Sequence, residues 1–146
     1  MLDLLHNKLD AYLRENNPDV VLPLEAEEAY KDFLLSKLDG LDGMIASMKQ
    51  DEVPAYIIEE QCIHMLKEGF RPSRFNYVKE VLETDFESQF IKLMANGLLV
   101  YECVNIIEHC SEVFEHFVFN EANEDNGSLR LAITGTVSKY FEGVKM

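Results

Sequence analysis

The chain has 146 residues, of which 47% are apolar and nine are phenylalanine, and this composition excludes an intrinsically disordered protein. A domain of about this length buries roughly 68–70% of the surface of its unfolded chain. We therefore expect a hydrophobic core that is stable without disulfides or bound metal ions. The 27 acidic residues outnumber the 13 basic ones and give a net charge of -14. This charge excludes general nucleic-acid binding and favours solubility or a basic protein partner.

The cysteines Cys62, Cys103 and Cys110 are odd in number and include no C-x-x-C pair. We interpret them as reduced thiols of a cytoplasmic protein, because disulfides persist mainly in oxidising compartments. The N-terminal segment lacks the basic start and the small-residue cleavage site of a signal peptide. No apolar run approaches the roughly 18 residues of a membrane span, so we expect neither export nor membrane insertion.

Helical periodicity organises the first part of the chain. Leucines at helical spacing predict a helix over residues 2–15, which ends because the residue before Pro18 avoids the α region. A second helix is predicted to begin near Pro23, a residue tolerated in a first turn. Tyr30, Leu34 and Leu38 recur at helical spacing, and we expect this stripe of the second helix to face the core.

Glycines in the stretch 39–44 end this second helix, and residues 45–50 are predicted to add one short turn. Asp51 is then expected to cap a third helix over residues 53–68, with Pro54 early in it. Because this third helix is apolar around much of its circumference, we expect it to be the most buried one.

Gly69 is predicted to end the third helix in a left-handed conformation, and Ser73 to cap a fourth helix. The long apolar segment 90–107 is also predicted to be helical. A single helix and a pair of helices divided at Asn96-Gly97 are the two alternatives for this segment.

A short helix is predicted over residues 112–117, before an exposed acidic loop at residues 120–128. The last element is ambiguous, because residues 129–137 fit the alternation of a strand and also fit one helix face that extends to Val144. We favour the helix, in which a close helix crossing is expected to offset the low helix propensity of Gly135.

Together these elements predict an all-α protein: a multihelical single domain of six or seven helices over residues 1–146, with a strand in the last segment as the alternative. Two sub-bundles, residues 1–69 and 70–146, are a variant of this prediction. The expected core includes Leu9, Leu13, Phe33, Ile58, Cys62, Leu66, Leu82, Phe86, Leu98, Ile106, Phe114 and Val137.

Four short motifs recur in order along the chain. They are L-x-x-Y-L-x-E-x-x-P from Leu9, G-F-x-x-S-x-F-N from Gly69, V-F at Val113, and T-G-T-x-x-x-Y-x-E from Thr134. Through these motifs the chain resembles the bacterial family called domain of unknown function 1896, small acidic helical proteins often encoded on conjugative transposons. The resemblance implies a helical fold and a mobile-element context. It implies no catalytic residue, because that family has no established activity.

The best metal candidates are His109, Glu112 and His116, which share one face if their helix is continuous and then provide two imidazoles and a carboxylate. Ser111 is a natural N-cap, however, and a helix that restarted there would separate the three side chains. We therefore expect no metal and no other cofactor, and these three residues remain the weaker alternative.

Cys62 and His64 suggest a thiol nucleophile with its base, but residues i and i+2 of a helix point in different directions. The chain contains no phosphate-binding glycine loop and no G-x-S-x-G motif. The sequence therefore predicts a protein that is not an enzyme.

Binding candidates lie at the start of the fourth helix, where Arg71 and Arg74 flank the predicted cap Ser73 and Tyr77 follows. Free backbone N–H groups at a helix start, next to cations, are able to bind an anion or an acidic partner. The structural interpretation is that Ser73 caps the helix, Tyr77 packs, and surface carboxylates pair with the two arginines. We favour the structural interpretation.

The leading functional hypothesis is a non-enzymatic helical interaction protein that binds another protein, as an accessory product of a mobile element. Apolar faces on the second to fourth helices also predict a weak homodimer. The alternative is an acidic DNA mimic that occupies a DNA-binding or restriction enzyme. A metal-binding protein or enzyme is the third hypothesis.

Overall fold

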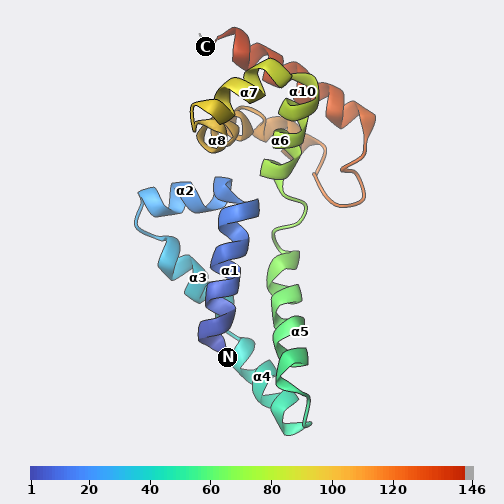
Figure 1. Cartoon of the computed structure of the whole chain (residues 1–146). Coiled ribbons are helices and arrows are strands. Elements are labelled where there is room, and N and C mark those ends of the chain that lie inside the picture. The colour runs from blue at the N-terminus through green and yellow to red at the C-terminus, as the bar shows by residue number, and fades with distance from the viewer. Residues whose placement is uncertain (144–146) are drawn as a thin grey trace. The chain divides into compact units, whose positions relative to one another are not determined.

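The computed structural model describes residues 1–143, in which every regular element is a helix (Figure 1). The helices are α1 (Leu2–Asn16), α2 (Pro18–Ala26), α3 (Tyr30–Leu38), α4 (Leu41–Gln50), α5 (Ala55–Glu68), α6 (Arg74–Asp85), α7 (Glu87–Ala95), α8 (Leu99–His109), α9 (Ser111–His116) and α10 (Gly127–Glu142). The predicted all-α class is confirmed. The expected six or seven helices are too few, and the strand alternative for residues 129–137 is wrong because α10 contains them.

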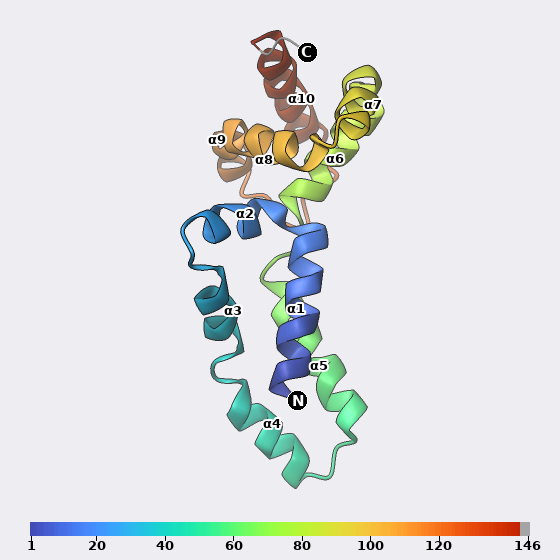
Figure 2. The ribbon, with the colours of Figure 1, turned by 60° about the vertical axis from the view of Figure 1, so that its left-hand side comes forward.

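The chain divides into two compact units, Met1–Arg71 and Pro72–Met146. Each unit has a hydrophobic core of its own. In the first unit α1 packs against α2, α3 and α5, as two views show (Figures 1 and 2). In the second unit α6 packs against α7, α8 and α10, and α10 also contacts α8 and α9.

Helix α1 follows its sequence prediction closely. Leu5, Leu9 and Leu13 lie one turn apart and are completely buried, so they form the central stripe of the first core. The helix ends at Asn16, and Pro18 then occupies the first turn of α2, where its missing N–H costs nothing.

The predicted second helix is in fact two helices, α2 and α3. Pro23 lies inside α2 and does not begin it. Glu28 has a φ of 57°, a left-handed conformation that ends the helical path before Tyr30. The inward stripe of α3 was predicted correctly, since Tyr30, Leu34 and Leu38 are all buried.

Several helix-end predictions fail in the middle of the first unit. Residues 41–50 form the full helix α4, and Asp51 ends that helix, whereas Pro54 occupies the N-cap position of α5. Gly69 has a φ of -66°, so it is right-handed and not left-handed.

Helix α5 is also less buried than expected. Its buried residues are confined to one stripe, Ile58, Cys62 and Leu66, while Met65 is exposed. The helix is therefore an ordinary amphipathic helix with one face in the core.

The second unit resolves the ambiguity of the long apolar segment. Gly97 has a φ of 70°, and this left-handed residue separates α7 from α8. Leu98, directly after it, is 46% exposed and does not belong to the core, contrary to its sequence prediction. Gly135 makes no close helix crossing, because a methyl group added there would meet no atom within 4 Å among the described residues.

Most other predicted core residues are buried as expected, except that Phe33 and Phe86 are only partly buried against their cores. Val144, the last residue of the predicted helix face, lies outside the described residues. Within residues 1–143, no helix combines the length and the apolar character that crossing a membrane requires.

The α1 stripe provides a stability test. We expect Leu9→Ala to lower the free energy of unfolding by about 2–5 kcal/mol, because it leaves a cavity in a fully buried site. Leu4→Ala on the same helix is the matched control, since Leu4 is exposed, and it should cost less than about 1 kcal/mol. Urea unfolding followed by circular dichroism measures both variants. Equal losses would contradict the assignment of the stripe.

Candidate functional site

The start of α6 is a capped helix end. The Ser73 hydroxyl accepts a hydrogen bond from the Asn76 backbone N–H at 3.0 Å, which confirms the predicted N-cap. The Tyr77 backbone N–H donates to the Ser73 carbonyl at 3.1 Å. The cap therefore already occupies a backbone donor that an anion site would need.

Arg74 and Tyr77 pack against an aromatic cluster of the second unit. The Arg74 guanidinium lies 5.0 Å from the centroid of the Phe114 ring, within the range of a cation–π interaction. The Tyr77 ring makes edge contacts with Phe114 at 5.8 Å and with Phe119 at 5.2 Å between centroids. Burial raises the pKa of Tyr77. These two side chains thus have structural contacts that account for their positions.

The structure groups three of the four predicted binding residues. Ser73, Arg74 and Tyr77 belong to the second unit, whereas the exposed Arg71 is the last residue of the first. A binding role for any of them stays a prediction.

The alternative metal ligands are not brought together. Helix α8 ends at His109 and α9 begins at Ser111, so the three side chains do not share one continuous helix. The His109 ring packs against Tyr140, and His116 packs against Phe117. In the part of the chain that the structure describes, no group of three or more His, Cys, Asp or Glu side chains is arranged to hold a metal ion.

Ser111 does not act as the expected N-cap. Its hydroxyl donates to the Glu108 carbonyl at 3.0 Å, and Cys110 occupies the cap position of α9 without a side-chain bond. The helix still breaks at the predicted place, but a backbone turn at Cys110 breaks it.

The cysteines lie in the two cores. Burial raises the pKa of Cys62, and His64 Nε2 instead lies 3.0 Å from a carboxylate oxygen of Glu68 on the exposed side of α5. Burial also raises the pKa of Cys103 to about 12 and that of Cys110 to about 11. All three therefore remain thiols at neutral pH, which disfavours a nucleophilic role.

A polar cluster joins α8 to α10. The Tyr140 hydroxyl donates to a carboxylate oxygen of Glu102, and the His109 ring lies edge-on to the Tyr140 ring at 4.9 Å. His109 Nδ1 lies 2.9 Å from the Asn105 carbonyl oxygen. An open depression of about 390 Å³ borders this cluster and is also lined by Lys139. The sequence did not single out this cluster, because its residues lie far apart in the chain.

The Tyr140 hydroxyl is held in its protonated form. Desolvation by burial, followed by the hydrogen bond to Glu102, raises the pKa of Tyr140 to about 12. A phenol with this pKa is a poor base at neutral pH, so the cluster acts as a link between two helices.

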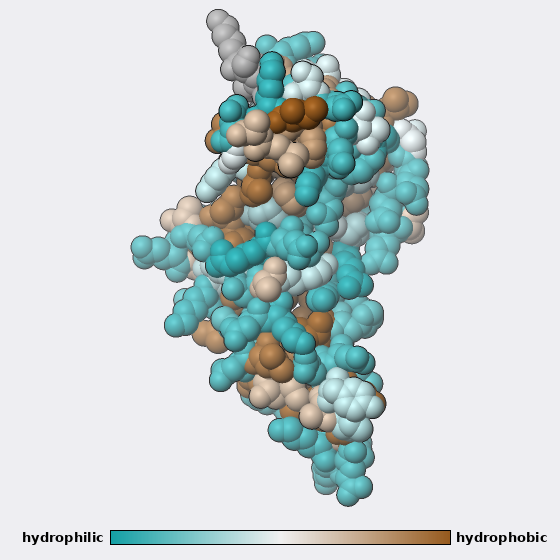
Figure 3. Space-filling model, viewed as in Figure 1, coloured by the Kyte–Doolittle hydropathy of each residue, from teal (hydrophilic) through white to brown (hydrophobic). Residues whose placement is uncertain are grey.

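Several exposed apolar residues of the second unit lie on α7 and around the start of α8. We call their surface the α7–α8 face, and it consists of Ile91, Met94, Leu98 and Tyr101. Their exposed fractions are 56%, 56%, 46% and 60%. Ile91 and Met94 are three residues apart on α7 and so share one side of the helix. The space-filling view shows apolar side chains gathered over α7 (Figure 3).

Acidic residues dominate the chain around and after this face. Residues 93–129 contain no Lys or Arg. The same stretch contains Glu102, Glu108, Glu112, Glu115, Glu121, Glu124 and Asp125. Lys92 lies next to Ile91, but no other Lys or Arg follows until Arg130, and this excess of carboxylates favours a partner that brings positive charge.

Comparisons with known proteins identify no relative: the chain matches no protein-family model, no curated protein and no solved structure. The resemblance to domain of unknown function 1896 therefore stays a prediction.

The structural interpretation of Arg74 is testable. Arg74→Glu removes a cation–π contact of about 0.5–1 kcal/mol. It also places an acid at the first turn of α6, which contributes about 0.3–1 kcal/mol in the opposite direction. We therefore expect the free energy of unfolding to change by less than about 1 kcal/mol, and added phosphate to shift the melting temperature equally in both proteins. A phosphate stabilisation seen in the wild type and lost in Arg74→Glu would establish an anion site.

The Tyr140 pKa predicts a pH-dependent link. The native pKa of about 12 exceeds the value near 10 of an unfolded tyrosine. The stabilisation of the folded state by protonated Tyr140 is therefore complete below about pH 10. It should be lost as the pH rises from about 10 to about 12. Tyr140→Phe should lack this loss, and ultraviolet absorbance titration should show one late-titrating phenol fewer. Tyr101→Phe, which removes an exposed phenol, is the control, and identical late titration in all three proteins would contradict the assignment.

Proposed function

We propose that the chain is a non-enzymatic helical interaction protein that binds another protein through the α7–α8 face. The observation that supports this function is the concentration of exposed Ile91, Met94, Leu98 and Tyr101 on adjoining helices. Single exposed apolar side chains are common on soluble domains, whereas a gathered set is typical of an interaction surface.

The size of the face sets the strength of the interaction. Full burial of an Ile, Leu or Met side chain contributes about 1.5–3 kcal/mol, and the four residues of the face are about half exposed. Covering the face therefore contributes roughly 4 kcal/mol in total. Association itself costs at least that much, so the partner must supply additional favourable contacts.

The negative charge of the protein indicates that the additional contacts are made with Lys and Arg side chains of the partner. With a net charge of -14 and no Lys or Arg between residues 93 and 129, the protein attracts cations. The partner segment that fits is an amphipathic helix whose apolar stripe covers the face and whose flanks carry Lys and Arg. Such binding weakens as salt is added, because salt screens exposed charges beyond about 8–10 Å. An accessory role in a mobile element, implied by the family resemblance, is consistent with an adaptor of this kind.

A DNA mimic is the second candidate, and the same cation-free stretch favours it. The carboxylates on residues 102–125 would occupy the basic cleft of a DNA-binding or restriction enzyme. In that case charge alone carries the binding, and the α7–α8 face has no part in it.

Substitution of the face tests the proposal. Ile91→Asp should weaken partner binding at least tenfold, because a charge replaces a central apolar contact. It should change the free energy of unfolding by less than about 0.5 kcal/mol, since Ile91 is exposed. Leu131→Asp is the matched control: it introduces the same charge at a 76% exposed leucine on α10 and should leave binding unchanged. Affinity capture with all three proteins, quantified by mass spectrometry, measures the effect.

The outcomes separate the alternatives. A basic partner that is captured by wild type and Leu131→Asp, and lost with Ile91→Asp, supports the proposal. Capture that is insensitive to Ile91→Asp and is displaced by duplex DNA would support the mimic instead. Self-association lost with Ile91→Asp in sedimentation experiments would make a second copy the partner, through a different surface from the second to fourth predicted helices on which the weak homodimer prediction rests.

A further inference from the structure

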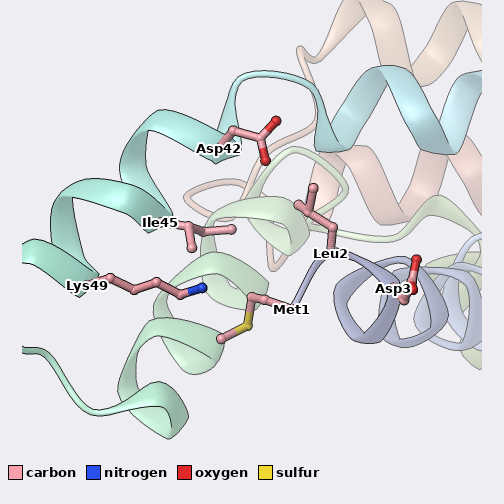
Figure 4. A pocket seen from close by; sticks show the side chains of 6 residues that line it. All are labelled: Met1, Leu2, Asp3, Asp42, Ile45 and Lys49. Atoms are coloured by element: carbon pink, nitrogen blue, oxygen red, sulfur yellow. The ribbon is translucent and has the colours of Figure 1, made fainter.

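A groove in the first unit lies between the start of α1 and the helices α3 and α4. Two adjoining depressions form it, of about 360 Å³ and 300 Å³. Leu2, Asp3 and Asp42 line both of them, so the two make one continuous feature. In the close view, Leu2 points toward Asp42 and Ile45, while Lys49 and Met1 lie together beyond Ile45 (Figure 4).

The turn between α3 and α4 shapes this groove. Gly40 has a φ of 88°, a left-handed conformation that residues with a Cβ rarely adopt, and it separates α3 from α4. Asp39 and Asp42, on either side of this turn, thereby line the groove together with Asp3 of α1. The three carboxylates thus come from two places in the sequence, the start of α1 and the α3–α4 turn.

The groove has an apolar floor. Leu38 and Ile45 are buried beneath it, and Leu35 is 50% exposed along its side. Leu2 extends the apolar surface between the two depressions. Each depression alone lies at the lower end of the range for binding pockets, so the groove suits one or two medium-sized side chains.

The rim of the groove is acidic and unpaired. Across residues 1–143, no ion pair or hydrogen bond engages the side chains of Asp3, Asp39 or Asp42. Lys49 lies at the opposite end from Asp42, beside Met1 (Figure 4). The groove therefore has carboxylates at one end and the Lys49 ammonium beside Met1 at the other, so its charge differs along its length.

We propose that this groove is a second docking site, independent of the α7–α8 face, for a short basic segment of another protein. A leucine-sized side chain of that segment lies on the floor formed by Leu2 and Ile45. A neighbouring Lys or Arg of the segment lies at the acidic end, near Asp3 and Asp42. Lys49 repels a second cation at its own end and thereby orients the bound segment.

Two synthetic peptides test this site. The first alternates leucine with lysine over five residues and has blocked ends, and the second has glutamate in place of lysine. Titration followed by nitrogen–proton NMR should shift the amide signals of Asp3, Asp42 and Ile45 with the lysine peptide and not with the glutamate peptide. Binding should weaken at least tenfold in the double variant Asp3→Asn/Asp42→Asn.

A matched control isolates the groove from general attraction. Glu60→Gln/Glu83→Gln removes the same amount of charge from exposed sites outside the groove and should change the affinity less than twofold. Ile91→Asp should also leave peptide binding intact. The proposal for the groove and the proposal for the α7–α8 face are therefore tested independently.

Two results would overturn the proposal. One is an equal loss of affinity in both double variants, which would mean that the peptide follows only the net charge. The other is a set of groove shifts that depends on protein concentration in the absence of peptide, which would mean that a second copy of the chain occupies the groove.

Discussion

The buried leucine stripe of α1 is the contact on which the first unit depends. Leu5, Leu9 and Leu13 have no exposed surface, and α1 packs against α2, α3 and α5. Helices α2 and α3 have nine residues each, a length at which an isolated helix is marginal in water. Their helical state is therefore a property of the packed unit, and the groove formed by the start of α1 depends on it as well.

Sequence periodicity identified the helices better than it identified their ends. The leucines of α1 and the stripe of α3 follow from spacing alone, because burial of one face imposes it. The breaks at Glu28 and after Gln50 do not follow from spacing, since they depend on left-handed residues that are not glycine. Residues with a Cβ rarely adopt this conformation, so a glutamate at either position gives no sign of it in the sequence.

The candidate surfaces were harder to predict, for a related reason. Leu98 fits an apolar pattern that indicates burial, but the left-handed Gly97 redirects the chain and leaves Leu98 outside. Tyr77 packs as the structural interpretation predicted, whereas Arg74 lies over the Phe114 ring, a contact that the sequence did not predict. The groove carboxylates come from separate segments, so only a folded unit brings them together. The net charge of -14 leads to the prediction of a basic partner, which stays a prediction, and composition contains no information on where such a partner would bind.

Because each core contains at least one buried cysteine, thiol labelling can detect local opening of either core. Cys62 is buried in the core of the first unit, while Cys103 and Cys110 are buried in the core of the second. A buried thiol with a raised pKa reacts with an alkylating reagent only after its surroundings open. The rate of alkylation at each cysteine thus reports how often the core around that cysteine opens. Peptide mass mapping distinguishes the three sites, so one labelling experiment shows whether the two cores open together or separately.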